Sequence, residues 1–175
     1  MIEAYRSARR YNDCQLLLVG GSATDDPEGS QVLADCRERA AGDPDVHVLE
    51  LPPTANVEIN ALQRASTVIV QKSLKEGFGL TVTEALWKGK PVIATATGGI
   101  PLQVTHKYSG ILTHSIEGTA YWLKQLLNAP DYARWLGGNG REHVRHNFLL
   151  LRQLRDYLLV VLALDHPGET LINLG

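Results

Sequence analysis

The sequence predicts an α/β protein built on a doubly wound, Rossmann-like parallel sheet. Three observations carry this prediction. Short apolar runs without polar alternation recur along the 175 residues, and such runs are typical of strands buried on both faces. Longer segments with helical periodicity lie between them, and clusters of glycine, proline and aspartate separate the two kinds of segment. Strands that alternate with helices pair in parallel through right-handed crossovers.

In the first half of the chain, each expected element has a recognisable limit. Residues 15–19 form an apolar strand that Gly20-Gly21 ends, and residues 67–71 form a strand rich in β-branched side chains. The expected strands are 15–19, 46–49, 67–71, 91–95 and 110–113, and the expected helices are 3–11, 30–41, 57–65 and 80–88. We therefore expect a layered domain with no internal repeat.

From residue 116 onward the pattern is helical, with breaks expected near Pro130, Gly137-Gly138 and Asn147. A nearly all-apolar final helix is expected over 149–164. The tail that follows holds one further candidate strand, 170–174. The predicted organisation is one domain over residues 1–164 and a tail over residues 165–175.

Composition narrows the classes of function. The formal net charge of -2 does not favour binding to nucleic acid or anionic lipid, which are themselves negatively charged. The longest apolar run, residues 157–164, is too short to span a membrane, and the charged start at Met1 does not read as a signal peptide. Cys14 and Cys36 form no Cys-x-x-Cys pair, which favours idle thiols in the reducing cytoplasm.

One loop carries residues suited to a polar ligand. Glu76 opens it, Gly77 and Gly79 let the backbone approach a ligand closely, and the helix that follows turns free N–H groups toward an anion. Glu84 lies one turn inside that helix. Ionised carboxylates only accept hydrogen bonds, so they suit pairs of hydroxyls. A sugar nucleotide has hydroxyls at both ends and phosphate between them, and it fits this layout.

Each of these residues also has an interpretation without a ligand. Thr81-x-x-Glu84 matches a capping box, which would account for Glu84, and Glu76 could be a solvated loop charge. Lys72, after the preceding strand, could reach a phosphate or serve as a charge at the rim of the site. The residues alone leave these alternatives open.

The whole string is more specific than its parts. Glu76 and Glu84 stand seven residues apart around Gly-Phe-Gly-Leu-Thr. This resembles the E-x7-E signature of retaining glycosyltransferases of the GT-B fold, family 4, group 1, which include sucrose and trehalose synthases. Further matches lie at residues 60–66, 89–94 and 97–101. Trehalose-forming enzymes are the subgroup most similar, through Gln71-Lys72-Ser73, residues 84–89, Gly98-Gly99-Ile100 and Gln103.

This resemblance implies roles for particular residues. Glu76, the implied catalytic residue, would bind hydroxyls of the donor glucose, and Glu84 would bind the ribose diol. The nucleobase would lie near Gly20-Gly21 and residues 51–54. The implied donor-binding residues are Glu76, Gly77, Phe78, Gly79, Leu80, Thr81, Glu84, Gly98, Gly99 and Ile100. The donor would be UDP- or ADP-glucose, without a cofactor or metal ion, because helix N-termini and basic side chains offset the diphosphate charge.

The chemistry implied is transfer with retention through an oxocarbenium-like state. The departing phosphate oxygen takes the acceptor's proton on the same face of the sugar, so the protein supplies positioning and electrostatics. A carboxylate nucleophile is the alternative.

The resemblance also implies what this chain lacks. In the family a central strand and a loop with an Arg and a Lys precede the position of Met1, and a separate lobe binds the acceptor. We therefore expect a lobe that is inactive alone, with a gap at the centre of its sheet. The tail strand near Leu171 or a second copy of the chain would fill that gap, and the final helix would pack toward the absent lobe.

Two other functions remain open at this point. One is a fragment without catalytic activity that binds nucleotide or a partner protein. The other is a sugar-nucleotide epimerase of the related two-lobed fold, which would need a further carboxylate and histidine constellation. His143 and His146 lie three residues apart on a helix, but no carboxylate or cysteine completes a metal site with them.

Overall fold

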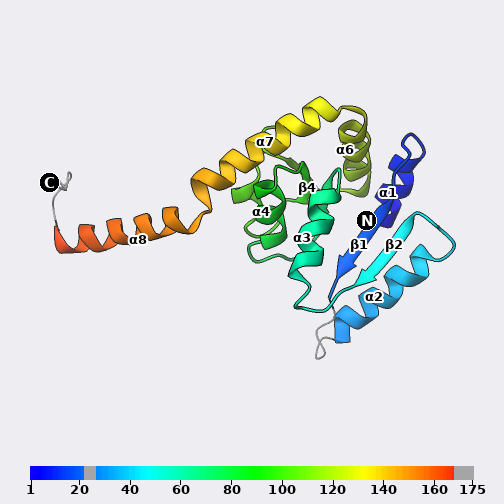
Figure 1. Ribbon diagram of the computed structural model, residues 1–175, viewed down its shortest axis with the longest axis horizontal. Coiled ribbons are helices and arrows are strands. Elements are labelled where there is room, and N and C mark those ends of the chain that lie inside the picture. The colour runs from blue at the N-terminus through cyan, green and yellow to red at the C-terminus, as the bar shows by residue number, and fades with distance from the viewer. Residues whose placement is uncertain (22–26, 168–175) are drawn as a thin grey trace.

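The computed structural model describes residues 1–21 and 27–167, and in them parallel strands alternate with helices (Figure 1). The elements are α1 (Ile2–Arg9), β1 (Leu16–Gly20), α2 (Pro27–Ala40), β2 (Val46–Glu50), α3 (Asn56–Ala65), β3 (Ile69–Gln71), α4 (Leu80–Trp87), β4 (Val92–Thr95), α5 (Ile100–Gln103), β5 (Ile111–Thr113), α6 (Ile116–Asn128), α7 (Pro130–Asn147) and α8 (Leu150–Asp165). The candidate strand 170–174 lies outside the described residues.

The strands form two parallel sheets, which confirms the predicted class. β1 pairs with β2, starting at Leu16 opposite Val46. β4 is the central strand of the order β3-β4-β5, and its Ile93 stands opposite both Val70 and Ile111. The side chains of β4 are buried on both faces, which explains why its sequence shows no polar alternation.

The two sheets are not joined by a strand pair. Within residues 1–21 and 27–167, β1 pairs with β2 alone and β3 pairs with β4 alone. Each of these strands therefore has one edge whose backbone groups meet no strand of the described chain. The described strands thus fall into two separate sheets, where the sequence analysis expected one sheet with a gap at its centre.

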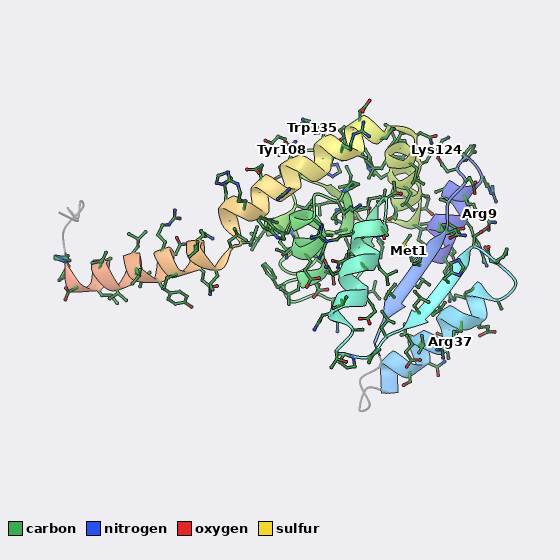
Figure 2. The ribbon with its side chains drawn as sticks, viewed as in Figure 1. Met1, Arg9, Arg37, Tyr108, Lys124 and Trp135 are labelled. Atoms are coloured by element: carbon green, nitrogen blue, oxygen red, sulfur yellow. The ribbon has the colours of Figure 1, made fainter. Side chains whose placement is uncertain are left out.

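Helix α1 packs against both sheets. Ile2 and Tyr5 belong to the cluster that covers β1 and β2, whereas Ala8 belongs to the cluster around β4 and β5. Met1 lies between the sheets and packs against both clusters (Figure 2). The helix is anchored at its end by Arg9, which pairs with two aspartates in the α2–β2 connection. α1 therefore holds together two sheets that share no strand pair.

Helix α7 corrects one prediction. A break was expected at Gly137-Gly138, but the helix runs without interruption from Pro130 to Asn147. Its glycines allow close packing on α4 instead. A Cβ atom on Gly137 would lie 2.0 Å from the carbonyl oxygen of Gly89, and one on Gly140 would lie 2.6 Å from Cδ2 of Leu86. The predicted breaks at Pro130 and Asn147 are confirmed, since they coincide with the two ends of the helix.

Helix α8 extends away from the rest of the molecule (Figure 1). None of its residues is buried, although its side chains are mostly apolar. The exposed large apolar residues of this helix include Leu150, Leu151, Leu154, Leu158 and Leu164. That the helix packs toward another lobe stays a prediction. No helix in the described part of the chain has both the length and the apolar character needed to cross a membrane.

Two neighbouring glycines of α7 provide a test of this packing. Gly137→Ala would drive a methyl group into the Gly89 backbone, so we expect a loss of about 2 kcal/mol or more in the free energy of unfolding. Gly138→Ala is the matched control, because a Cβ there meets open space and alanine favours helix by up to about 1 kcal/mol. Denaturant unfolding of both variants measures the difference, and equal stabilities would contradict the packing account.

Candidate donor-binding site

The candidate site lies at the carboxyl end of the three-stranded sheet, where two loops leave neighbouring strands. β3 ends at Gln71 and leads into residues 72–79, the motif loop. β4 ends at Thr95 and leads into residues 96–99, the second loop. Because β3 and β4 are parallel neighbours, both loops emerge at the same edge. Ligands of doubly wound sheets bind at such edges.

The two loops are packed backbone against backbone. The amide of Gly99 donates to the carbonyl oxygen of Gly77 at 2.8 Å. Gly98 has φ of +55°, and a Cβ atom on it would lie only 1.7 Å from the carbonyl oxygen of Glu76. A residue other than glycine therefore cannot occupy position 98 without moving one of the loops.

A buried glutamine joins the same loops from the side. Gln103, in the short helix α5, accepts a hydrogen bond from the Thr83 hydroxyl at 2.5 Å and donates to the carbonyl oxygen of Phe78. Its side chain is completely buried. The amide therefore fixes the end of the motif loop relative to helix α4, and both of its polar atoms have partners.

Glu76 is held by two polar side chains at the end of β3. Its Oε2 atom accepts hydrogen bonds from the Ser73 hydroxyl at 3.1 Å and from Nε2 of Gln71 at 3.2 Å. Gln71 also donates to the Ser73 hydroxyl, at 2.8 Å. The half-buried carboxylate thus has a fixed orientation, and its Oε1 atom makes no hydrogen bond to any residue the structure describes. The interpretation of Glu76 as a merely solvated charge is wrong.

Glu84 lies in the second turn of α4 and is exposed. Its Oε2 atom accepts a hydrogen bond from Nε2 of Gln63 in α3, at 3.1 Å. The capping-box interpretation of Thr81 and Glu84 is wrong, because the N-cap residue is Gly79 and no side chain caps the helix. Glu84 therefore does not cap the helix, and its carboxylate can accept hydrogen bonds from a ligand.

The start of α4 presents main-chain donors. Gly79 adopts a left-handed conformation with φ of +88°, and the helix begins at the next residue. The amides of Phe78, Gly79, Leu80 and Thr81 donate to no acceptor within residues 1–21 and 27–167. Unpaired amides at the N-terminus of a helix attract anions such as phosphate.

The second loop offers less than the sequence analysis expected. The amide of Gly99 is used by Gly77, and the amide of Ile100 donates to the carbonyl oxygen of Thr97 at 3.2 Å. Ile100 itself is buried, with its side chain against Gly79. The amides of Gly99 and Ile100 are therefore used within the protein, and these two residues support the site without offering a free donor. Gly98 is exposed.

Lys72 is the basic side chain nearest in sequence to the end of β3. It is half-buried, and burial lowers its pKa from the usual value for lysine. In the part of the chain that the structure describes, it forms no ion pair. No group of three or more His, Cys, Asp or Glu side chains gathers into a metal-binding cluster in those residues.

The carboxyl ends of the other two strands also meet. The amide of Leu51 donates to the carbonyl oxygen of Gly20 at 2.9 Å, and a Cβ atom on Gly21 would lie 3.0 Å from the carbonyl oxygen of Leu51. The two segments that the resemblance assigns to the nucleobase, residues 20–21 and 51–54, are therefore in contact.

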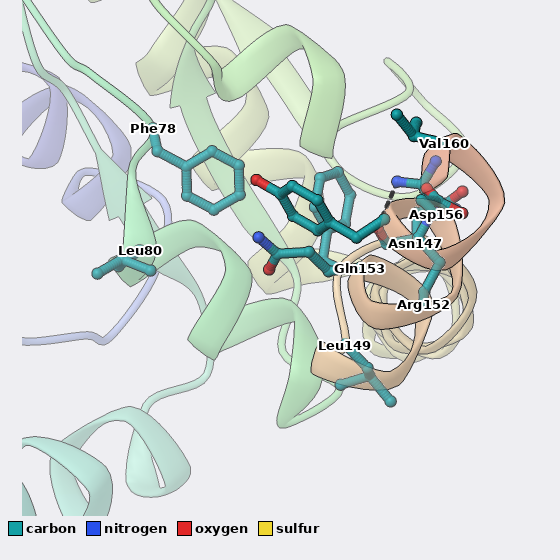
Figure 3. Close-up of a pocket in the computed structure, with 10 residues that line it drawn as sticks. Phe78, Leu80, Asn147, Leu149, Arg152, Gln153, Asp156 and Val160 are labelled. Atoms are coloured by element: carbon teal, nitrogen blue, oxygen red, sulfur yellow. Dashed lines mark hydrogen bonds and ion pairs between the residues drawn. The ribbon is translucent and has the colours of Figure 1, made fainter. Parts of the chain in front are cut away.

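A cavity of about 520 Å³ adjoins the motif loop. Phe78 and Leu80 form one side of it, and Gln153 of α8 points toward them from the other (Figure 3). The floor includes Phe148, whose ring centroid lies 5.7 Å from that of Phe78. The start of α8 thus lines this cavity beside the motif loop.

Sequence reasoning did not find the roles of Gln63 and Gln103. Gln63 continues the buried stripe of α3 that passes through Ala55 and Ile59. A polar residue at such a position was the available signal. Gln103 was matched in the resemblance to trehalose-forming enzymes, but its contacts were missed because α5 was not predicted.

Known glycosyltransferases are similar to this chain in sequence. Residues 1–143 match the family model described as glycosyl transferases group 1. A trehalose synthase of Rubrobacter xylanophilus is 45% identical over 160 residues, which cover 90% of this chain and 38% of that protein. A trehalose phosphorylase of Pleurotus pulmonarius is 44% identical over 105 residues, covering 57% of this chain and 14% of that protein.

Solved structures show the same fold. The Anabaena protein HepE, crystallised in complex with UDP-glucose, has a TM-score of 0.73 at 20% identity, over 92% of this chain and 45% of that one. The sucrose-phosphate synthase of Thermosynechococcus elongatus also has a TM-score of 0.73, at 30% identity, over 93% of this chain and 42% of that one.

The chain spans about two fifths of the length of the trehalose synthase that it matches. The family model covers most of the chain, and the solved structures share its fold. The chain belongs to the group 1 glycosyltransferases.

Proposed function

We propose that this chain binds the nucleotide-sugar donor of a retaining glycosyltransferase that transfers glucose from UDP- or ADP-glucose to a sugar acceptor, as a trehalose synthase does. The observation that carries the proposal is the placement of two oriented carboxylates around a helix N-terminus with unpaired amides. Glu76 and Glu84 each use one oxygen within the protein and keep one available. The trehalose synthases among the relatives support the choice of reaction.

The ligand would extend along the motif loop. Glu84 would accept hydrogen bonds from the ribose diol, and the amides at the start of α4 would donate to phosphate oxygens. Glu76 would accept from hydroxyls of the glucose. Lys72 would approach the phosphate, because a nearby anion stabilises the charged form of a half-buried lysine. The base would contact residues 20–21 and 51–54.

In the proposed reaction the bond between the anomeric carbon and the diphosphate oxygen breaks while the acceptor oxygen attacks from the same face. The electron pair of the broken bond stays on the diphosphate, and its oxygen takes the proton of the acceptor hydroxyl. Positive charge develops at the sugar ring, and the hydrogen bonds from sugar hydroxyls to Glu76 strengthen as it does. Ser73 and Gln71 fix the Glu76 carboxylate, which suits an acceptor of hydrogen bonds better than a nucleophile that must move.

Acceptor binding forms a second part of the proposal. We place it in a lobe that corresponds to the remainder of the trehalose synthase sequences, and we expect this chain alone to bind donor without turnover. A second copy of the chain is the other candidate partner. The free thiols Cys14 and Cys36 support a cytoplasmic location. Main-chain amides and basic side chains would offset the diphosphate charge without a metal ion.

Nucleotide titration tests the donor site. We expect the chain to bind UDP or ADP, and the glucose conjugate of the same nucleotide, with a Kd that EDTA does not change. Glu84→Ala should raise that Kd about tenfold, because it removes acceptors for the ribose diol. Isothermal titration calorimetry measures this, with Glu117→Ala, an exposed glutamate of α6, as the matched control. An unchanged Kd for Glu84→Ala, or no binding by the unmodified chain at millimolar nucleotide, would contradict the proposal.

The contact between the two loops gives a second test. Gly98→Ala places a methyl group on the Glu76 carbonyl and adds strain at a positive φ, so we expect a loss of about 2 kcal/mol or more in stability together with weaker nucleotide binding. Gly138→Ala, whose Cβ meets open space outside the site, should not lower stability, because alanine favours helix over glycine by up to about 1 kcal/mol. Thermal unfolding and calorimetry of both variants decide the matter. Normal binding by Gly98→Ala would show that the loop contact is dispensable.

A further inference from the structure

Gln63 lies between the side chains of Glu84, in helix α4, and Lys88, the C-cap residue of that helix. Its Nε2 atom donates to Oε2 of Glu84 at 3.1 Å, and its Oε1 atom accepts from Nζ of Lys88 at 2.5 Å. Its side chain is buried, with 6% of its surface exposed. α3 and α4 lie side by side (Figure 1), and this amide is a polar link between them.

The orientation of the amide is fixed by Lys88. A lysine ammonium has only donors, so only the oxygen of the Gln63 amide can face it. The nitrogen must then face the other way, where the Glu84 carboxylate accepts from it. The amide therefore has one favourable orientation, and that orientation delivers a donor to Glu84.

The Gln63 amide also takes the place of a direct ion pair between Glu84 and Lys88. Glu84 and the C-cap residue Lys88 stand four residues apart, and a glutamate and a lysine in this order and spacing on a helix commonly form a direct ion pair. No ion pair joins them here, although both lie in the described part of the chain; each contacts Gln63 instead. A direct pair would occupy the carboxylate with an ammonium and compete with ligand hydroxyls.

We propose that Gln63 is a positioning residue that keeps Lys88 away from the Glu84 carboxylate and thereby keeps Glu84 available to the ribose diol of the donor. This inference rests on the proposed function of Glu84 and goes beyond it. Gln63 touches no ligand in this account, and it acts through Glu84. Without the amide, Lys88 moves onto Glu84 and ribose binding weakens.

The test begins with Gln63→Met, which keeps the size of the side chain and removes both hydrogen-bonding groups. For the nucleoside diphosphate that the unmodified chain binds more tightly, UDP or ADP, we expect the Kd to rise about fivefold. Combining it with Lys88→Met should bring the Kd back to within about twofold, because no ammonium is left to pair with Glu84. Gln125→Met, in α6, is the matched control.

A change of ligand separates positioning from a general effect on folding. The 2′,3′-dideoxy form of the same diphosphate lacks the diol, so Gln63→Met should bind it as well as the unmodified chain does. In a Glu84→Ala background, Gln63→Met should have no further effect on the Kd. If Gln63→Met does not fold, Gln63→Leu serves instead, because it is an apolar side chain of similar size that has neither an acceptor for Lys88 nor a donor for Glu84. We expect the same loss of affinity from it.

The outcomes are distinguishable. If Glu84→Ala weakens binding but Gln63→Met does not, this inference is overturned and the proposed function stands. The inference also fails if the loss is equal for the dideoxy ligand, or if Lys88→Met restores nothing, since Gln63 would then be only a structural tie between helices. If the unmodified chain binds neither UDP nor ADP, the proposed function falls and the inference falls with it.

Discussion

The close passage of the Glu76 backbone against Gly98 is the constraint on which the rest of the site depends. No side chain fits between the two loops at that point, so their relative position is set by backbone atoms. The hydrogen bond from Gly99 to Gly77 and the two bonds of Gln103 maintain the same spacing. A motif loop held from three directions can present unpaired amides in fixed positions, which is what binding of a charged ligand requires.

Hydrophobic pattern was sufficient to predict the described strands in their order and the helices other than α5. Buried parallel strands need continuous apolar runs, and the segments around Ile69, Ile93 and Ile111 have them. The pattern failed at Gly137-Gly138, because glycine disfavours helix in isolation but here allows α7 to approach α4. Whether the helix continues through these glycines depends on its contact with a helix 50 residues away in the chain. Local helix propensity contains no information about that contact.

The site was predictable in outline and not in detail. Spacing placed Glu76 and Glu84 at one edge of the sheet, and glycine content indicated close approach of a backbone. The contact that orients Glu84 could not be read from the sequence, because it comes from Gln63 in another element. The contacts that fix the end of the motif loop come in the same way from Gln103 in α5. The sequence shows that a residue is glutamine, but it does not show whether the amide faces solvent or bridges two other groups. Only tertiary packing separates the two cases.

The absence of a strand pair between β1 and β3 in the described residues has a consequence for how a ligand affects this fold. The sheet of β1 and β2 forms one packing unit and the elements around β4 form another, joined through α1. Sub-global opening between such units costs less than unfolding either one. A nucleotide that reached from Glu84 to residues 51–54 would brace the two units against each other, and occupancy would suppress that opening by mass action.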